Sequence, residues 1–215
     1  MQKSDYIAAA VREIESPEFA YTRQILDVNE VAMEDGRYKV EDVIEKENRV
    51  DVFFAIKDQQ YFLRISLDKE SGEVVFPNIQ NANYCYLDAV SETKSLSELA
   101  SFTKIKYTGG YSKGDVLKFG NRERTAKLSS ISFELLDTLC LDTEDAIGKL
   151  LDKLSADKDG IKKLIENSDA VIRVCKNQYV SANAGFSMSP ALVKRLSEFG
   201  LGIDIDTYIV GERLG

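Results

Sequence analysis

The clearest pattern of hydrophobic and polar positions lies between residues 185 and 211. Ser189 and Pro190 are typical of a helix start, because the serine hydroxyl accepts a free backbone N–H and proline has a helical φ. Hydrophobic side chains recur at helical spacing as far as Gly200, which favours a helix end. From Ile203 to Val210 the period is two, which predicts a strand. A helix followed so soon by a strand indicates an α+β or α/β fold.

The first 80 residues predict a small module of one helix followed by an antiparallel meander. Ser4 is positioned to cap a helix that extends to Glu15, and Ser16-Pro17 ends it. Residues 18–35 fit neither period and end in a turn. Alternating segments separated by polar turns then predict strands over residues 38–47, 49–57, 61–67 and 73–76.

Residues 77–83 are polar and turn-rich, and we interpret them as a linker or an inter-strand loop. Strands and helices alternate beyond this segment. Strands are predicted over residues 84–90, 128–136 and 170–175, and helices from Ser95, from Asp142 or Thr143, and around residues 161–165. We therefore predict an α+β protein with a helix-plus-meander module over residues 1–80 and an α+β sheet domain over residues 81–215.

Charge and composition narrow the function. The net charge is −8, which argues against general nucleic-acid binding. The charge is uneven, because residues 1–80 carry 10 Lys and Arg against 17 Asp and Glu. The chain has no histidine, so nucleophilic triads that need histidine and most catalytic zinc sites are excluded.

Features that the sequence lacks indicate the compartment of the protein. No apolar run approaches the roughly 20 residues that span a bilayer, and the first residues do not resemble a signal peptide. Cys85, Cys140 and Cys175 are far apart and odd in number, so we interpret them as reduced, mostly buried thiols. We expect a cytoplasmic protein without a membrane segment or a resident cofactor.

Three segments resemble a bacterial family known as the domain of unknown function 4279. They are YLDAVSETKSLSELASFTKIKYTGGYSKGD, LDTEDAIGKLLDKLSADKDGIKKL and SMSPALVKRLSEFGLGIDIDTYIVG, which together span about 130 residues, from 84 to 211. The chain departs from the family pattern at Tyr111, near which a tryptophan is expected. The resemblance implies an intracellular bacterial α+β domain, and it implies no substrate, cofactor or reaction. Some small acidic bacterial proteins are immunity proteins that block a partner, which we use as an analogy.

A basic segment over residues 104–127 is the first candidate site. It carries seven Lys and Arg against two acidic residues, and the candidate binding residues are Lys113, Lys118, Arg122, Arg124 and Lys127. Such a cluster suits an anionic partner: a phosphate-bearing ligand, a nucleic-acid end or an acidic protein surface. The other interpretation, which we favour from the sequence, is a solvated surface whose charges pair with the acidic N-terminal module. Within the segment, the glycine-rich residues 108–114 suit either a backbone anion site or a plain turn, and we favour the turn.

Asp204 and Asp206 are the second candidate site. They lie two residues apart, so both side chains point to one face of the predicted strand. Paired carboxylates can bind a metal ion or perform acid–base chemistry, although no third ligand is evident. Alternating aspartates are also typical of a solvated strand face, which is the interpretation we favour.

The favoured hypothesis is a non-enzymatic protein that binds another protein, with an immunity or inhibitory role as its specific form. The acidic N-terminal module would suit a basic partner, because complementary charge accelerates association. The alternative is a metal-assisted hydrolase or transferase that uses Asp204 and Asp206.

Overall fold

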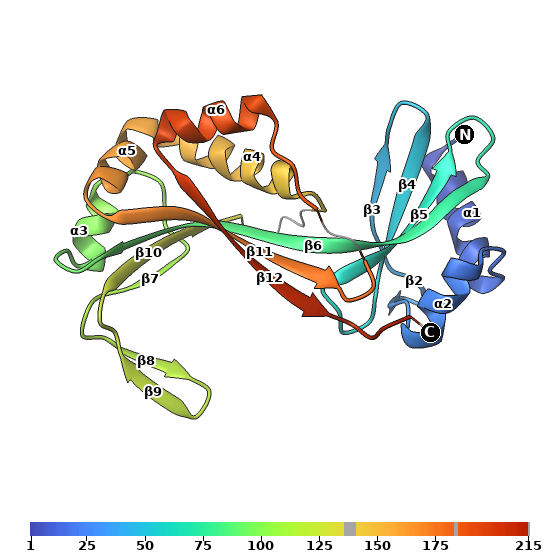
Figure 1. Cartoon of the computed structure of the whole chain (residues 1–215), viewed down its shortest axis with the longest axis horizontal. Coiled ribbons are helices and arrows are strands. Elements are labelled where there is room, and N and C mark those ends of the chain that lie inside the picture. Colours follow the sequence, from blue (N-terminus) through green and yellow to red (C-terminus); the bar gives the residue numbers. More distant parts are fainter. Residues whose placement is uncertain (136–140, 183–184, 215) are drawn as a thin grey trace. The chain divides into compact units, whose positions relative to one another are not determined.

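The computed structural model describes residues 1–135, 141–182 and 185–214 (Figure 1). The chain divides into two compact units. Unit 1 comprises Met1–Ala82, Asn177–Ala184 and Thr207–Gly215, and unit 2 comprises Asn83–Lys176 and Gly185–Asp206. Helices and mostly antiparallel strands make up both units, so the predicted α+β class is confirmed. None of the described helices is long and apolar enough to cross a membrane.

Unit 1 is built from two helices on an antiparallel meander. Its elements are α1 (Lys3–Glu15), α2 (Ala20–Val28), β1 (Met33–Glu34), β2 (Arg37–Tyr38), β3 (Val40–Glu45), β4 (Arg49–Ala55), β5 (Tyr61–Asp68) and the first part of β6 (Val74–Ser91). The strands pair in the order β3-β4-β5-β6, while β1 and β2 form a separate ribbon. The core includes Ala10 and Ile14 of α1 and the fully buried Val52, Leu63 and Ile65 of the sheet. The hydrophobic face of α1 therefore covers the meander.

Helix α2 was not predicted, because a contact from outside the helix fixes its start. The buried side chain of Glu13, on α1, accepts the backbone N–H groups of Glu18 and Phe19 at 3.1 and 3.2 Å. Phe19 is the residue before the helix, so a carboxylate six positions earlier occupies the place of a local cap. No pattern within residues 18–28 reveals such a cap.

The interpretation of residues 77–83 as a linker or loop was wrong, because these residues lie within the 18-residue strand β6. Pro77 pairs with Ile65 of β5 in the antiparallel register. The side chain of Asn81 accepts the backbone N–H of Tyr179 at 2.9 Å. A polar residue that is typical of turns thus bonds a neighbouring strand here, and composition alone could not distinguish the two cases.

Unit 2 has a five-stranded sheet with helices on one face. Its elements are the rest of β6, α3 (Leu96–Ser101), β7 (Gly109–Tyr111), β8 (Val116–Phe119), β9 (Arg122–Thr125), β10 (Ser129–Glu134), α4 (Thr143–Leu154), a 3₁₀ turn (Ser155–Asp157), α5 (Lys158–Glu166), the first part of β11 (Asp169–Tyr179), α6 (Pro190–Phe199) and the first part of β12 (Gly202–Val210). The strand order is β7-β10-β6-β11-β12. Helices α4, α5 and α6 lie on one face, and no described helix covers the other (Figure 1).

The predicted helix and strand between residues 185 and 211 are confirmed in detail. The Ser189 hydroxyl accepts the N–H of Leu192 at 3.2 Å, and Pro190 is the first residue of α6. Gly200 ends the helix with a φ of 75°. Leu192, Leu196 and other hydrophobic side chains of α6 are buried in the core of unit 2. These signals are local, which is why they could be predicted from the sequence.

A buried carboxylate is a second feature of the unit 1 sheet. Asp51 of β4 has no exposed side-chain surface and accepts the hydroxyl of Ser66 at 2.5 Å. Lys46 Nζ and Arg49 Nε lie 3.0 and 3.3 Å from its two oxygens. Burial alone would raise the pKa of Asp51, but the Ser66 hydrogen bond and the two cations outweigh it and lower the pKa below its ordinary value. The carboxylate is therefore ionised in the folded chain at neutral pH.

We expect Asp51→Asn to lower the free energy of unfolding by about 1–3 kcal/mol at pH 7, because it removes the charge that the two cations face. The folded pKa lies below the unfolded value of about 3.9, so this stability is present above pH 4 and is lost as the pH falls through the folded pKa. Urea unfolding at pH 7 and at about pH 3 measures both effects.

The matched control is Glu45→Gln in the neighbouring strand, whose exposed carboxylate pairs with Lys69 at 3.2 Å. It should cost less than about 0.5 kcal/mol. If both variants lower the free energy of unfolding equally at pH 7, the buried Asp51 carboxylate contributes no more stability than an exposed ion pair.

Candidate functional site

Strands β8 and β9 form a separate two-stranded ribbon, which we call the basic arm (residues 116–125). The register pairs Val116 with Thr125, Leu117 with Arg124 and Lys118 with Glu123. In Figure 1 the arm projects from the sheet of unit 2. Among the described residues, neither strand packs extensively against another element. The arm is therefore held by its own pairing and by its base.

Hydrogen bonds on both sides fix the base of the arm. Gly114 N donates to Ala126 O at 2.9 Å, and Ala126 N donates to Asp115 O at 2.8 Å. The carboxylate of Asp115 accepts the N–H of Ser112 at 2.7 Å. The hydroxyl of Ser129, at the start of β10, accepts the N–H of Lys113 at 2.9 Å. An ordered base therefore presents an arm that is open to solvent.

The structure brings three of the five predicted basic residues onto the arm. Lys118, Arg122 and Arg124 lie on it and are exposed, while Lys113 and Lys127 lie at its base. Lys113 Nζ donates to the carbonyl of Glu92 at 3.2 Å, and Lys118 lies 3.6 Å from Glu123.

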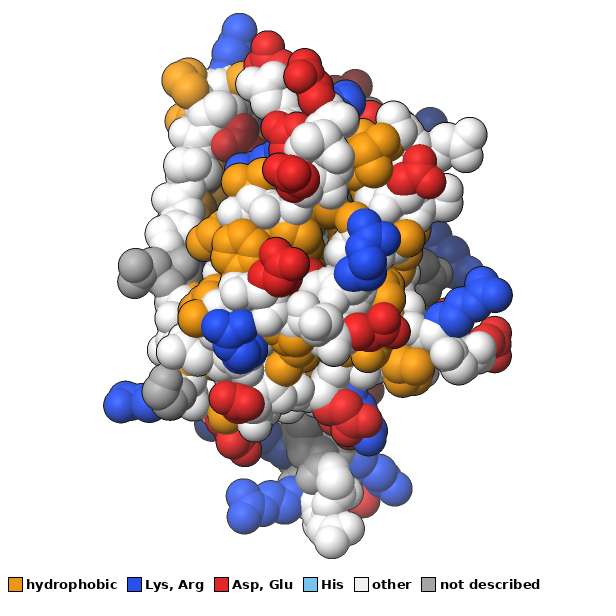
Figure 2. All heavy atoms as spheres, turned by 90° about the vertical axis from the view of Figure 1, so that its right-hand side faces the viewer, with side chains coloured by type: hydrophobic (Ala, Val, Ile, Leu, Met, Phe, Trp, Pro, Cys, Tyr) orange, Lys and Arg blue, Asp and Glu red, His pale blue; other side chains and the backbone are white. Residues whose placement is uncertain are grey.

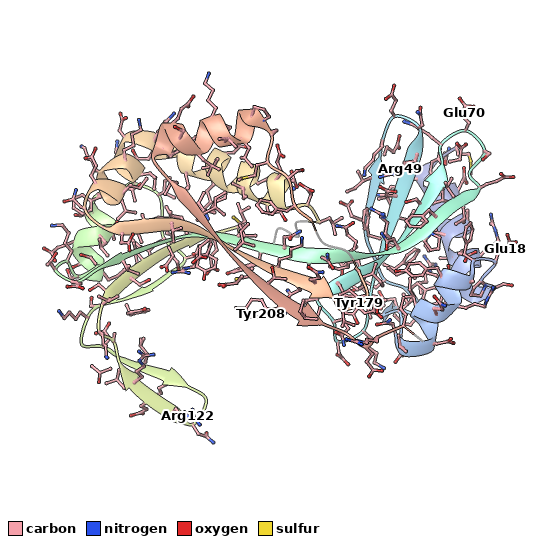
Figure 3. The ribbon with its side chains drawn as sticks, in the orientation of Figure 1. Glu18, Arg49, Glu70, Arg122, Tyr179 and Tyr208 are labelled. Atoms are coloured by element: carbon pink, nitrogen blue, oxygen red, sulfur yellow. The ribbon has the colours of Figure 1, made fainter. Side chains whose placement is uncertain are left out.

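The remaining three cations are available to a partner. Arg122, Arg124 and Lys127 make no ion pair or side-chain hydrogen bond with the described part of the chain. Arg122 points away from the ribbon (Figure 3). Arg122 and Arg124 are two positions apart on one strand, so they share a face, and Leu117 is the cross-strand partner of Arg124.

The hairpin itself was missed in the sequence, although a signal is present. Gly120 and Asn121 separate the two strands, and a Gly-Asn pair is a common two-residue hairpin connection. Gly120 has a φ of 58°, which a hairpin turn of this kind requires. The strands are short and rich in charge, so the alternation around this turn was too weak to indicate them.

The glycine-rich residues 108–114 do not form a backbone anion site. Gly109–Tyr111 is strand β7, which pairs with β10, so this part is not the plain turn that we favoured either. Thr108 N donates to Ser132 O, and the N–H groups of Ser112, Lys113 and Gly114 are bonded within the base of the arm. These donors are consumed by the fold.

Asp204 and Asp206 lie on the sheet face that no described helix covers. Arg173 pairs with Asp204 there, so this carboxylate already has a cation partner. Arg173 of β11 contacts Asp88 of β6 at 3.1 Å and Asp204 of β12 at 2.6 Å. The Ser130 hydroxyl also donates to Asp88 at 3.0 Å. The three strands thus share one ionic network, whose central cation the sequence did not indicate. No group of three acidic, histidine or cysteine side chains suited to a metal ion occurs in the described ranges.

The thiols offer no reactive group near this face. Burial raises the pKa of Cys175, and the charge of Asp206 raises it further. A thiol with a raised pKa stays protonated at neutral pH and is a weak nucleophile. Cys85 is buried in the core of unit 2, and Cys140 lies outside the described residues.

The acidic residues of unit 1 do not form a patch of one sign on the face drawn in Figure 2. Acidic and basic side chains alternate there, with hydrophobic side chains between them. Several acidic residues are also paired within unit 1, including Glu30 with Lys57 at 2.7 Å and Glu41 with Lys39 at 2.8 Å. This face of unit 1 therefore presents no surface of a single sign to a partner.

We expect Arg173→Met to create a weak divalent-cation response that the wild type lacks, because the carboxylates of Asp88 and Asp204 lose their shared cation. Thermal unfolding with and without about 5 mM Ca²⁺, which exceeds the dissociation constant of weak protein sites, measures it. Arg195→Met, which breaks the surface pair with Asp152, is the control and should show no response. A response of the wild type equal to that of the Arg173 variant would contradict this account.

Comparison with known proteins agrees with the resemblance seen over residues 84–211. The model of a family described as a domain of unknown function (DUF4279) matches residues 81–210. No curated protein and no solved structure matches the chain. The match covers more than half of the sequence. It includes the basic arm, the ionic network around Arg173, helix α6 and strand β12. By this match, the chain belongs to the DUF4279 family.

Proposed function

We propose that this chain is a non-enzymatic protein-binding module whose binding element is the basic arm, and that its partner presents an acidic surface. The observation that carries the proposal is the arm itself. It is a two-stranded ribbon on which Arg122 and Arg124 are exposed and have no ion-pair partner among the described residues, and it does not pack extensively against other described elements. A two-stranded ribbon is at best marginally stable alone in water, so a partner that covers it would stabilise it.

The side chains of the arm suit a protein surface. Arginine is enriched at protein interfaces, and its planar guanidinium can bind a carboxylate with two parallel hydrogen bonds. Val116 is 59% exposed and supplies apolar surface on the other face of the ribbon. Exposed charges of one sign also accelerate the encounter with a partner of opposite sign. Nucleic acid is less favoured, because the whole chain carries a net charge of −8.

An immunity or inhibitory role is the specific form of this proposal. An ordered base with a projecting arm could block a partner's site by occupying it, without any catalysis by this chain. Such a role requires no cofactor, and a cytoplasmic partner fits the sequence. The metal-assisted alternative is less favoured, because Asp204 already pairs with Arg173.

The test is a comparison of three immobilised proteins in a lysate of the source cells. They are the wild type, Arg122→Glu/Arg124→Glu, and the control Lys162→Glu/Lys163→Glu, which makes the same charge change on exposed positions of α5. The wild type and the control should retain a common protein in near-stoichiometric amounts, and the arm variant should retain about tenfold less or lower. Quantitative mass spectrometry of the eluates measures the retention.

Two further conditions sharpen the comparison. Retention should fall between about 50 and 500 mM salt, because exposed charge pairs are screened. Nuclease treatment should not change it. Equal retention by all three proteins would contradict the role of the arm, and loss of retention after nuclease treatment would indicate nucleic acid instead of protein.

A further inference from the structure

Strand β12 leaves an open edge on the sheet of unit 2. It is the last strand of the order β7-β10-β6-β11-β12, so within the described residues only β11 pairs with it. The unit 2 part of β12, residues 202–206, therefore presents unpaired backbone N–H and C=O groups along its outer side. Open edges of this kind accept strands from other chains unless charge, proline or a covering element prevents it.

The edge carries negative charge. Asp204 and Asp206 are exposed on one face of β12, while Ile203 and Ile205 pack toward the core of unit 2. Arg173 offsets only part of this charge, because it is shared between Asp88 and Asp204. Two copies of this edge would repel each other, because like charges on adjacent strands are unfavourable. The aspartates thus disfavour edge-to-edge pairing of β12 with itself and favour a basic strand.

The basic arm matches this edge in length, spacing and charge. Strand β9 has four residues, against five in the unit 2 part of β12. Arg122 and Arg124 are two positions apart on one face of β9, as are Asp204 and Asp206 on β12. Side chains directly opposite on adjacent strands lie about 5 Å apart, so each arginine would be within reach of an aspartate. The outer side of β9 is also unpaired among the described residues.

The arm cannot reach the β12 edge of its own chain. The arm extends from β7 and β10, at the opposite side of the sheet from β12. Four strand spacings of about 4.8 Å place β12 roughly 19 Å from β7, whereas four residues of an extended strand span only about 13 Å. Pairing of the arm with β12 therefore requires two molecules.

We propose that the basic arm of one molecule adds as a strand to the β12 edge of a second copy of this chain, with Arg122 and Arg124 facing Asp204 and Asp206. The inference rests on the proposed function, because it names a partner for the same arm. The contact is heterologous, since the arm and the edge are different surfaces. Such a contact leaves one arm and one edge free in every dimer, so assembly continues to larger rings or filaments. A foreign acidic partner would compete with the second copy for the arm.

Two variants that each remove one half of the contact test the inference. The arm variant is Arg122→Glu/Arg124→Glu and the edge variant is Asp206→Lys, which leaves the pair between Arg173 and Asp204 in place. Light scattering coupled to size-exclusion chromatography, at about 10–200 μM protein to bracket a micromolar contact, gives the masses. The mass of the wild type should rise with concentration beyond a dimer, and each variant alone should stay a monomer.

The 1:1 mixture of the two variants is the decisive sample. The intact edge of the arm variant can accept the intact arm of the edge variant, so the mixture should form a dimer and nothing larger. The controls are Lys162→Glu/Lys163→Glu and Glu166→Lys, which make the same charge changes on exposed positions of α5, and both should assemble like the wild type.

Other outcomes overturn the inference in distinguishable ways. A monomeric wild type across this range shows that the partner is not a second copy, and the proposed function then stands or falls with the lysate comparison. Assembly that survives in either variant shows that copies associate through another surface. A mixture that stays monomeric shows that the arm and the edge do not bind each other.

Discussion

Backbone hydrogen bonding at strand edges is the constraint on which the account of unit 2 depends. Every strand has two rows of N–H and C=O groups, and the order β7-β10-β6-β11-β12 leaves the outer row of β12 without a described partner. The basic arm has two such rows, because within the described ranges β8 and β9 pair only with each other. A strand that is paired on both sides has no free backbone groups, whereas an open edge can pair with a strand of another chain. Two arginines of unit 2 lie on the arm, and two aspartates lie on β12.

The fold therefore changes the interpretation of both candidate sites that the sequence indicated. Asp204 and Asp206 suggested metal chemistry as long as they were considered alone. Arg173 lies on another strand and forms an ion pair with Asp204, so this aspartate belongs to an ionic network on an open sheet face. The basic segment, by contrast, gains definition, because its central residues form a projecting ribbon.

Local signals explain what could be predicted from the sequence. Ser189, Pro190 and Gly200 act within one or two turns of α6, so their effect is legible without the fold. Contacts between distant residues explain what was missed. Glu13 starts α2 from another helix, and Asn81 bonds Tyr179 across the sheet, so residues with the composition of a loop became a helix and a strand. The role of Arg173 was missed for the same reason, because its partners Asp88 and Asp204 are distant from it in the sequence.

Hydrogen exchange of the backbone amides reports on the open strand edges themselves and therefore tests whether the arm pairs with the β12 edge. Dilute and concentrated samples of the wild type would be compared residue by residue. We predict that the unpaired amides of residues 116–125 and 202–206 exchange fast in the dilute sample and that both segments gain protection in the concentrated one. Residues 130–132 of β10 are already paired on both sides and should not change. Exchange that stays equally fast in both segments at every concentration would contradict the account.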